Sequence, residues 1–183
     1  LTKGNLTITN FLKSDDCLAT VEAMKSLGSD IEINNDKVHI KGKGLFSLKK
    51  PESTIDAGNS GTLIRLLTGI LSAQNFDSSL TGDESLRQRP MARIIKPLVS
   101  CGAKIESSDG KAPIFIKPPV SMLPVDYTQS VASAQVKSCL ILFSLFINEE
   151  SKFYEKVPTR DHTENLLEYL GFDIQRNQNS FSF

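Results

Sequence analysis

Two short stretches place small, hydroxyl and amide residues at the start of an expected helix. They are 58-GNSGTLIR-65 and 132-ASAQVKS-138, about one internal repeat apart. Free backbone N–H groups and the positive end of the helix dipole make such an entrance suited to anions. Gly61 would let a ligand approach the backbone closely, although a tight strand-to-helix turn explains the first stretch equally well when it is taken alone.

Side chains at these entrances add hydrogen-bond donors to the backbone groups. Three carry hydroxyls and one carries an amide that can orient a ligand hydroxyl: Ser60, Thr62, Ser133 and Gln135. If the repeats surround a pseudo-threefold axis, the two helix starts point into one shared cleft. The sequence therefore predicts a local site for an anionic ligand.

Arginines gather in the connections next to these entrances. They are Arg65, Arg87, Arg89 and Arg160. A guanidinium binds phosphate or carboxylate through a bidentate fork. The alternative for each arginine is a surface salt bridge with a carboxylate nearby in sequence: Asp83, Glu84, Asp161 or Glu164. Lys137 fits a site role and a structural role equally well.

General acid and base residues are harder to identify. Asp56, Asp83 and Asp161 are candidates by position only, and a helix-cap or turn role fits each of them better. His162 follows a cap aspartate and fits a helix start. Because no Ser/His/Asp or Cys/His arrangement emerges, the catalytic residues stay unknown and the chain is interpreted as an anion-binding surface.

Composition narrows the class of protein. Lys+Arg and Asp+Glu are both 21 in 183 residues, so the balance does not favour nucleic acid or an anionic membrane as partner. Three cysteines, Cys17, Cys101 and Cys139, are expected to be reduced core residues of a cytosolic protein. With only His39 and His162 as imidazoles, no zinc site is expected. The longest apolar run, 139–147, is too short to span a bilayer.

A repeated pattern organises the whole chain. A helix ends at Gly28, Gly102 and Gly171, roughly 70 residues apart, and a strand, a polar turn and a second strand follow. Working backwards from each glycine gives a β-α-β-α-β-β unit, so the predicted class is mixed α/β. We expect a single domain, 1–183, with units at about 1–45, 46–120 and 121–183. The first unit lacks its leading strand and helix.

The pattern also sets the expected elements and caps. Helices are expected at about 15–27, 60–73, 91–101, 132–147 and 162–170, and strands at 5–11, 53–57, 75–82, 122–125 and 151–157. Ser14 or Asp15 is expected to cap the first helix, and Asp161 with Glu164 has capping-box spacing. Pro90 is expected in a first helical turn.

Four motifs in this order resemble one enzyme family. 58-GNSGTLIR-65, 82-GDESLRQRPM-91, 132-ASAQVKS-138 and 159-TRDHTE-164 are similar to the 5-enolpyruvylshikimate-3-phosphate (EPSP) synthases, and the likeness covers essentially the whole chain. The resemblance implies an enolpyruvyl transferase-like domain of three β-α-β-α-β-β units, and substrates bound between two such domains. It implies transfer of the enolpyruvyl group of phosphoenolpyruvate to the 5-hydroxyl of shikimate 3-phosphate, in the shikimate pathway of aromatic amino acid biosynthesis, with no cofactor.

The resemblance also assigns substrate-binding residues. On the phosphoenolpyruvate side it implies Asn59, Gly61, Thr62 and Arg89, and on the shikimate 3-phosphate side Ser133, Ala134, Gln135, Thr159 and Arg160. Arg65 matches a family arginine with a structural role. The chain departs from the family at Leu66, where many members have proline, and Ala134 matches one of two family branches.

The resemblance leads to further expectations about the whole protein. The family's Pro-Gly-Asp-Lys-Ser element and its second domain are not in this sequence, so we expect the chain to begin partway into a longer protein and to be inactive alone. We expect a cytoplasmic monomer whose partners are the two substrates and the missing domain, with neither nucleic acid nor membrane. Two alternatives are a relative of the UDP-N-acetylglucosamine enolpyruvyl transferases and a non-catalytic anion-binding module.

Overall fold

A computed structural model describes residues 1–183. Its helices are α1 (Asp15–Ser26), α2 (Gly61–Leu71), α3 (Glu84–Gln88), α4 (Ala92–Ser100), α5 (Ala134–Ser144) and α6 (His162–Tyr169). Its first seven strands are β1 (Lys3–Ile8), β2 (Asp30–Asn34), β3 (Lys37–Lys43), β4 (Ile55–Asp56), β5 (Ser78–Thr81), β6 (Lys104–Ser108) and β7 (Lys111–Lys117). The last four are β8 (Asp126–Thr128), β9 (Lys152–Tyr154), β10 (Gln175–Arg176) and β11 (Ser180–Ser182).

The strands form three sheets that share one topology. Their orders are β1-β3-β2, β4-β5-β7-β6 and β8-β9-β11-β10. In the second and third sheets the leading pair is parallel and the other pairs are antiparallel. The first sheet matches the last three strands of the others. The predicted mixed α/β class with repeated β-α-β-α-β-β order is therefore confirmed, with α3 as an additional short helix.

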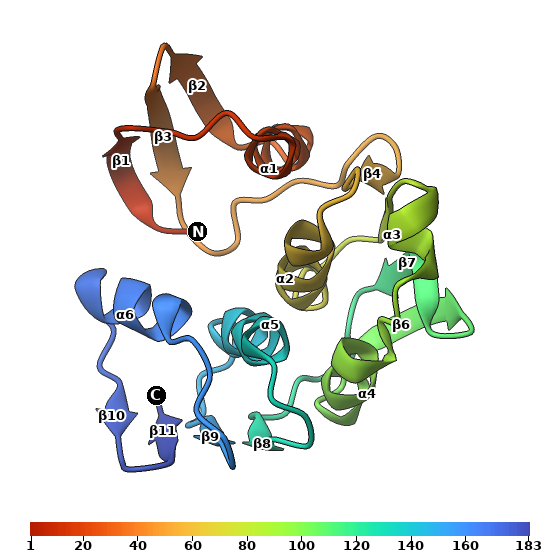
Figure 1. The fold of residues 1–183 in the computed structure, drawn as a ribbon, viewed down its shortest axis with the longest axis vertical. Coiled ribbons are helices and arrows are strands. Elements are labelled where there is room, and N and C mark those ends of the chain that lie inside the picture. Colours follow the sequence, from red (N-terminus) through yellow and green to blue (C-terminus); the bar gives the residue numbers. More distant parts are fainter.

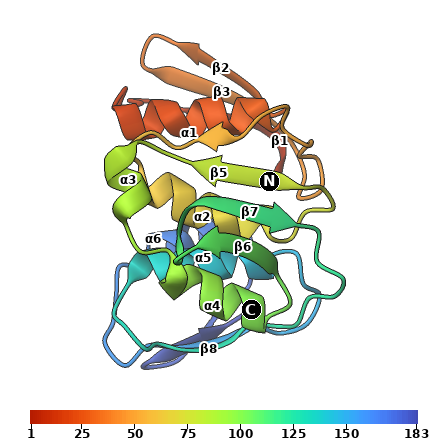
Figure 2. The same cartoon turned by 90° about the vertical axis from the view of Figure 1, so that its right-hand side faces the viewer.

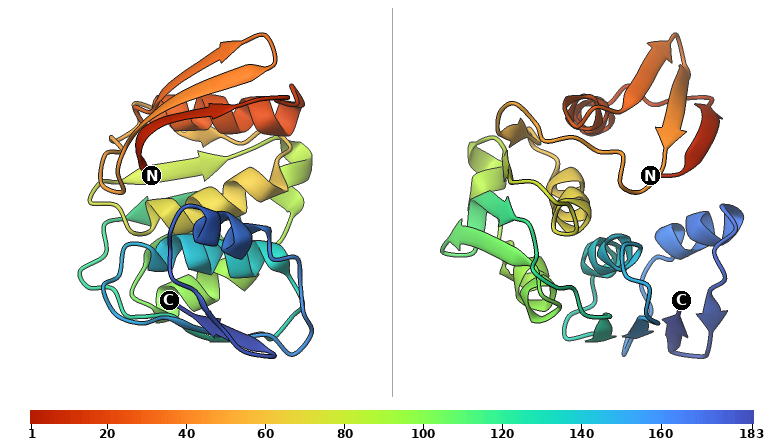
Figure 3. Two further views of the ribbon diagram at one scale, coloured as in Figure 1. Left: turned by 90° about the vertical axis from the view of Figure 1, so that its left-hand side faces the viewer. Right: turned by 180° about the vertical axis from the view of Figure 1, so that it is seen from behind.

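The sheets lie on the outside of an arc, and α2 and α5 lie side by side at its centre (Figure 1). From the side, the sheet of β5, β7 and β6 lies in front of α2 and α5 (Figure 2). Seen from the opposite side, α1, α2 and α5 run across the molecule one above another (Figure 3). This arrangement sets the starts of α2 and α5 near each other.

The two central helices are apolar on nearly every face, as buried helices are. Their buried residues join one continuous core that reaches α1 and the second and third sheets. Gly69 makes their close approach possible, because a Cβ atom there would overlap the carbonyl oxygen of Cys139. The α2–α5 contact therefore depends on a glycine at this position.

Serine hydroxyls cap the starts of both central helices. Ser60 Oγ accepts a hydrogen bond from the Leu63 N–H at 3.2 Å, and Ser133 Oγ accepts one from Val136 at 3.4 Å. Ser14 caps α1 in the same way, as predicted. Each cap satisfies one of the free N–H groups of a first helical turn and leaves others available.

Several local expectations are wrong. The predicted capping box fails because Asp161 makes no side-chain cap bond and Glu164 is buried against Lys137. Pro90 precedes the first turn of α4, whose N-cap is Met91. The leading strand of the third unit lies later than the expected 122–125, at β8.

The cysteine prediction is correct for two residues and wrong for one. Cys101 and Cys139 are buried free thiols. Cys17 is only half-buried, because it lies in the first turn of α1, whose buried residues, Val21 and Ala23, come later. None of the helices has the length and apolar character needed to cross a membrane.

Candidate functional site

A cavity of about 250 Å³ lies between the starts of α2 and α5 and the segment that leads into α6. Its lining residues are Thr62, Leu66, Ala134, Gln135, Ser138, Arg160, His162 and Thr163. Four of these are predicted site residues that come from two different repeats. The structure thus brings together side chains that are about 100 residues apart in sequence, at the two helix starts where anion binding is favoured.

Gln135 connects the two helix starts through its side-chain amide. Arg65 Nη1 donates to Gln135 Oε1 at 2.9 Å, and Gln135 Nε2 donates to Thr62 Oγ1 at 2.9 Å. Because the guanidinium only donates, it fixes which end of the amide faces Thr62. The Thr62 hydroxyl accepts from Gln135 and so keeps its own proton free for a ligand.

A second group of predicted residues adjoins the start of α2. Arg89 Nη2 donates to Asn59 Oδ1 at 2.5 Å, and Asn59 Nδ2 donates to Asp83 Oδ2 at 2.7 Å. The hydrogen bonds from Asn59 and from the Leu86 N–H hold the pKa of Asp83 below its ordinary value. Asp83 also caps α3, as its cap interpretation predicted. Its carboxylate therefore orients Asn59 toward Arg89.

Gly61 lies between the hydrogen-bonded group of Arg65 and Gln135 and the group of Arg89 and Asn59. A Cβ atom at this position would lie 2.7 Å from Arg65 Nη1 and 3.0 Å from Arg89 Nη1, so both guanidiniums lie against the first turn of α2. Burial lowers the pKa of Arg65, and the positive charges of Arg93 and Arg89 lower it further. Arg65 and Arg89 therefore place positive charge at the start of α2.

The salt-bridge interpretation of the predicted arginines is wrong. None of Arg65, Arg87, Arg89 and Arg160 forms an ion pair. Asp161 instead pairs with Arg176 at 3.5 Å, and Glu164 pairs with Lys137 at 2.6 Å. Arg65, Arg89 and Arg160 have no carboxylate in direct contact, so their guanidiniums favour binding of an anionic ligand. Arg87 is exposed on α3 and lines neither group.

Thr159 differs from the other predicted site residues. Its hydroxyl donates to Glu155 Oε1 at 2.6 Å, and it lines a neighbouring cavity of about 180 Å³ together with Glu164 and Arg176. Lys137 is 2% exposed and ion-pairs with Glu155 at 3.0 Å, so its role is internal. Glu155 could not be identified from the sequence, because a single glutamate after a short strand has no distinguishing pattern.

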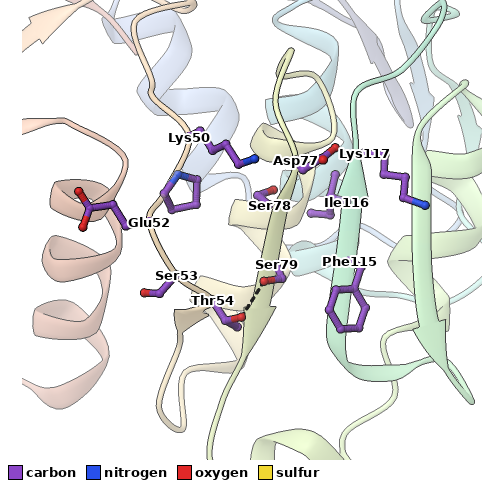
Figure 4. Close-up of a pocket in the computed structure, with 11 residues that line it drawn as sticks. Lys50, Glu52, Ser53, Thr54, Asp77, Ser78, Ser79, Phe115, Ile116 and Lys117 are labelled. Carbon is purple, nitrogen blue, oxygen red and sulfur yellow. Dashed lines mark hydrogen bonds between the residues drawn. The ribbon is translucent and has the colours of Figure 1, made fainter.

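A larger groove of about 400 Å³ lies away from these residues and contains none of them. It is lined by residues 50–54, 77–79 and 115–117. The hydroxyls of Thr54 and Ser79 form a hydrogen bond of 2.7 Å in this groove (Figure 4). Residues 50–54 and 77–79 precede the paired part of β4 and β5, whereas the start of α2 follows it. The groove is therefore at the other end of the parallel strand pair.

The amino-acid sequence as a whole matches one family. The family model described as EPSP synthase (3-phosphoshikimate 1-carboxyvinyltransferase) covers residues 1–183. The chain belongs to the EPSP synthase family. It is 50% identical over 179 residues to the 3-phosphoshikimate 1-carboxyvinyltransferase of Ruthia magnifica. The matched region is 98% of this chain and 41% of that relative. It is 48% identical to the protein of this name from Caldicellulosiruptor saccharolyticus, over 95% of this chain and 40% of the relative.

Solved structures agree with this family membership. EPSP synthase from Acinetobacter baumannii is 43% identical with a TM-score of 0.96, over 100% of this chain and 42% of that one. The enolpyruvyl transferase NikO from Streptomyces tendae, at 19% identity and a TM-score of 0.52, shares the fold. The chain thus spans about two-fifths of the length of the EPSP synthases that it matches. The expected likeness to one part of an EPSP synthase is confirmed.

Proposed function

We propose that this chain forms one substrate-binding wall of an EPSP synthase. The whole enzyme would transfer the enolpyruvyl group of phosphoenolpyruvate to the 5-hydroxyl of shikimate 3-phosphate. The observation that carries the proposal is the pair of adjoining helix starts with Arg65, Arg89 and Arg160, none of which forms an ion pair. Both substrates are phosphorylated, and such places favour phosphate.

The shikimate 3-phosphate side of the proposed site is the cavity between α2 and α5. Arg160 is exposed and unpaired there, so its guanidinium would bind the phosphate. Gln135 and the α5 start at Ser133-Ala134 would bind the ring hydroxyls and the phosphate. Thr159 would act through its contact with Glu155, because its hydroxyl is already bonded.

The phosphoenolpyruvate side of the proposed site is the start of α2. Arg89, oriented by Asn59, would bind an anionic group of the substrate. The N–H groups near Gly61 and the free proton of the Thr62 hydroxyl would complete the anion site.

The proposed reaction forms a bond between the 5-hydroxyl oxygen and C2 of phosphoenolpyruvate and breaks the C2–O bond to phosphate. In the overall balance the hydroxyl proton ends on the released phosphate, which leaves as hydrogen phosphate. The residues described here would hold both phosphates and bring the 5-hydroxyl oxygen close to C2 of phosphoenolpyruvate. Such orientation and charge stabilisation lower the activation barrier. No acid or base role is assigned to them.

The other expectations about the whole protein belong to this proposal. The proposed enzyme is a cytoplasmic monomer without a cofactor, and the second wall of its site belongs to a further domain. The chain itself forms a single domain, with units at about 1–45, 46–120 and 121–183. The isolated chain is expected to show no turnover, because positioning needs both walls.

A hybrid enzyme tests the proposal. In it, residues 1–183 replace the matching segment of the Acinetobacter baumannii EPSP synthase, to which they are 43% identical. With both substrates present, release of phosphate from phosphoenolpyruvate is expected, and Arg160→Met and Arg89→Met should each lower kcat/KM by about 10- to 100-fold. Exposed Arg87→Met is the matched control and should leave kcat/KM unchanged. A folded hybrid without turnover, or one indifferent to Arg89 and Arg160, would contradict the proposal.

A further inference from the structure

The segment between β9 and α6, residues 155–161, carries Arg160 to the α2–α5 cavity. It is not held by apolar burial, because Val157 is 57% exposed and Lys156 and Pro158 are also exposed. An exposed segment without apolar anchors is ordinarily mobile. Its conformation must therefore be set by polar contacts.

Those contacts end on the Glu155 carboxylate and on Gln129, whose Nε2 donates to Glu155 Oε1 at 3.5 Å. Glu155 Oε1 accepts from the Thr159 N–H at 3.1 Å and from the Thr159 hydroxyl at 2.6 Å. The Val157 N–H donates to Oε1 of Gln129, a residue that is 4% exposed, at 3.0 Å. The segment thus folds back on its own first residue directly before Arg160.

Lys137 holds both ends of this segment. Its Nζ atom lies 3.0 Å from Glu155 Oε2 at the start of the segment and 2.6 Å from Glu164 Oε1, just after its end. Lys137 is 2% exposed and the Glu164 side chain 3%, and Glu164 Oε2 has no other partner. A buried ammonium between two carboxylates favours one arrangement of the three groups, because moving either carboxylate away loses a strong attraction inside the protein.

Lys137 also belongs to the helix that forms the site. It lies on α5, two residues after Gln135, so one helix carries both the amide that lines the cavity and the ammonium that holds the Arg160 segment. We infer that Lys137 and Glu155 are positioning residues that fix Arg160 for the phosphate of shikimate 3-phosphate. This inference rests on the proposed function. Holding Arg160 in place before binding lowers the entropy lost on binding.

Glu155→Gln tests the inference with little risk to folding, because Lys137 keeps Glu164 as partner. Two readouts are needed: hydrogen exchange of the Thr159 amide without ligand, and calorimetric affinity of the chain for shikimate 3-phosphate. The variant should lose Thr159 protection and bind at least about tenfold more weakly. Thr159→Val should weaken binding while Thr159→Ser, which keeps the hydroxyl, should restore it.

Two controls separate this inference from the proposed function. Glu150→Gln removes an exposed carboxylate that pairs with Lys152 at 3.4 Å and should change neither readout. Arg160→Lys should weaken binding and leave Thr159 protected. Unchanged Thr159 protection in Glu155→Gln, or lost protection with unchanged affinity, would overturn the inference. Absence of binding by the unaltered chain, or equal binding by Arg160→Lys, would overturn the proposed function and, with it, the inference.

Discussion

The guanidinium of Arg65 on α2 donates to the side-chain carbonyl oxygen of Gln135 on α5, at 2.9 Å. This contact joins two repeats at their helix starts. It also sets the direction of the hydrogen bonds beyond it, since Gln135 then presents its NH₂ group to Thr62. Each hydrogen bond therefore runs in one direction, from Arg65 to Gln135 and from Gln135 to Thr62, and leaves the Thr62 hydroxyl proton for a ligand.

Gln135→Glu should reverse the direction of the hydrogen bond between residue 135 and Thr62. One carboxylate oxygen would accept from Arg65 and the other would accept the Thr62 proton, and a negative charge would face the cavity. Affinity for shikimate 3-phosphate should fall by about 10- to 100-fold, measured by calorimetry on the chain. Gln135→Met is the neutral control and should bind more tightly than the glutamate variant. If Gln135→Glu binds shikimate 3-phosphate equally well or more tightly, the proposed direction of these hydrogen bonds is wrong.

Gly61→Ala should weaken phosphoenolpyruvate binding without lowering the stability of the fold. The new methyl group would meet only the ends of two flexible side chains, Arg65 and Arg89, and alanine favours a helix over glycine by about 1 kcal/mol. The thermal midpoint should therefore stay the same or rise. The hybrid enzyme should show a KM for phosphoenolpyruvate raised by about tenfold, because both guanidiniums must move. An unchanged KM would show that their positions do not matter.

Gly69→Ala should instead lower the free energy of unfolding. Here the methyl group would overlap backbone, the carbonyl oxygen of Cys139, so α2 and α5 must move apart. We expect a loss of about 1–3 kcal/mol in denaturant unfolding. Thr20→Ala on the exposed face of α1 is the control and should change stability by less than about 0.5 kcal/mol. Equal stability of both variants would contradict the close helix contact.

Cys139 should make stability depend on alkaline pH. Burial raises the pKa of its thiol from 9.0 to about 12 in the folded chain. Between these values the unfolded chain binds fewer protons, so the free energy of unfolding falls as pH rises, by up to about 1.4 kcal/mol per pH unit. Below pH 9.0 this contribution is fully present. Cys139→Ala should show a shallower slope above that pH in urea unfolding, and an identical slope would contradict this assignment.

The main helices could be predicted from sequence because local signals fix them. An apolar pattern and a serine mark the starts of α2 and α5, and both serines are caps in the structure. The short α3 and the late start of β8 were not anticipated. Their extents depend on contacts with the neighbouring sheets more than on local pattern.

The members of the site were easier to predict than their partners. The sequence predicts both Asn59 and Arg89 in the site, but it does not predict their contact, because the two residues lie in different segments. Glu164 had the spacing of a capping box, yet the buried ammonium of Lys137 binds it instead. Such long-range partners depend on how segments pack, which local sequence does not encode.

An amide-resolved NMR titration of the chain with shikimate 3-phosphate tests the central claim most directly. The predicted result is selective shifts at Thr62, Gln135 and Arg160, with no such shifts when UDP-N-acetylglucosamine is added. Arg160→Met should abolish the shifts at Thr62 and Gln135. Shifts confined to residues outside the α2–α5 cavity, or equal shifts with both ligands, would contradict the claim that these helix starts bind shikimate 3-phosphate.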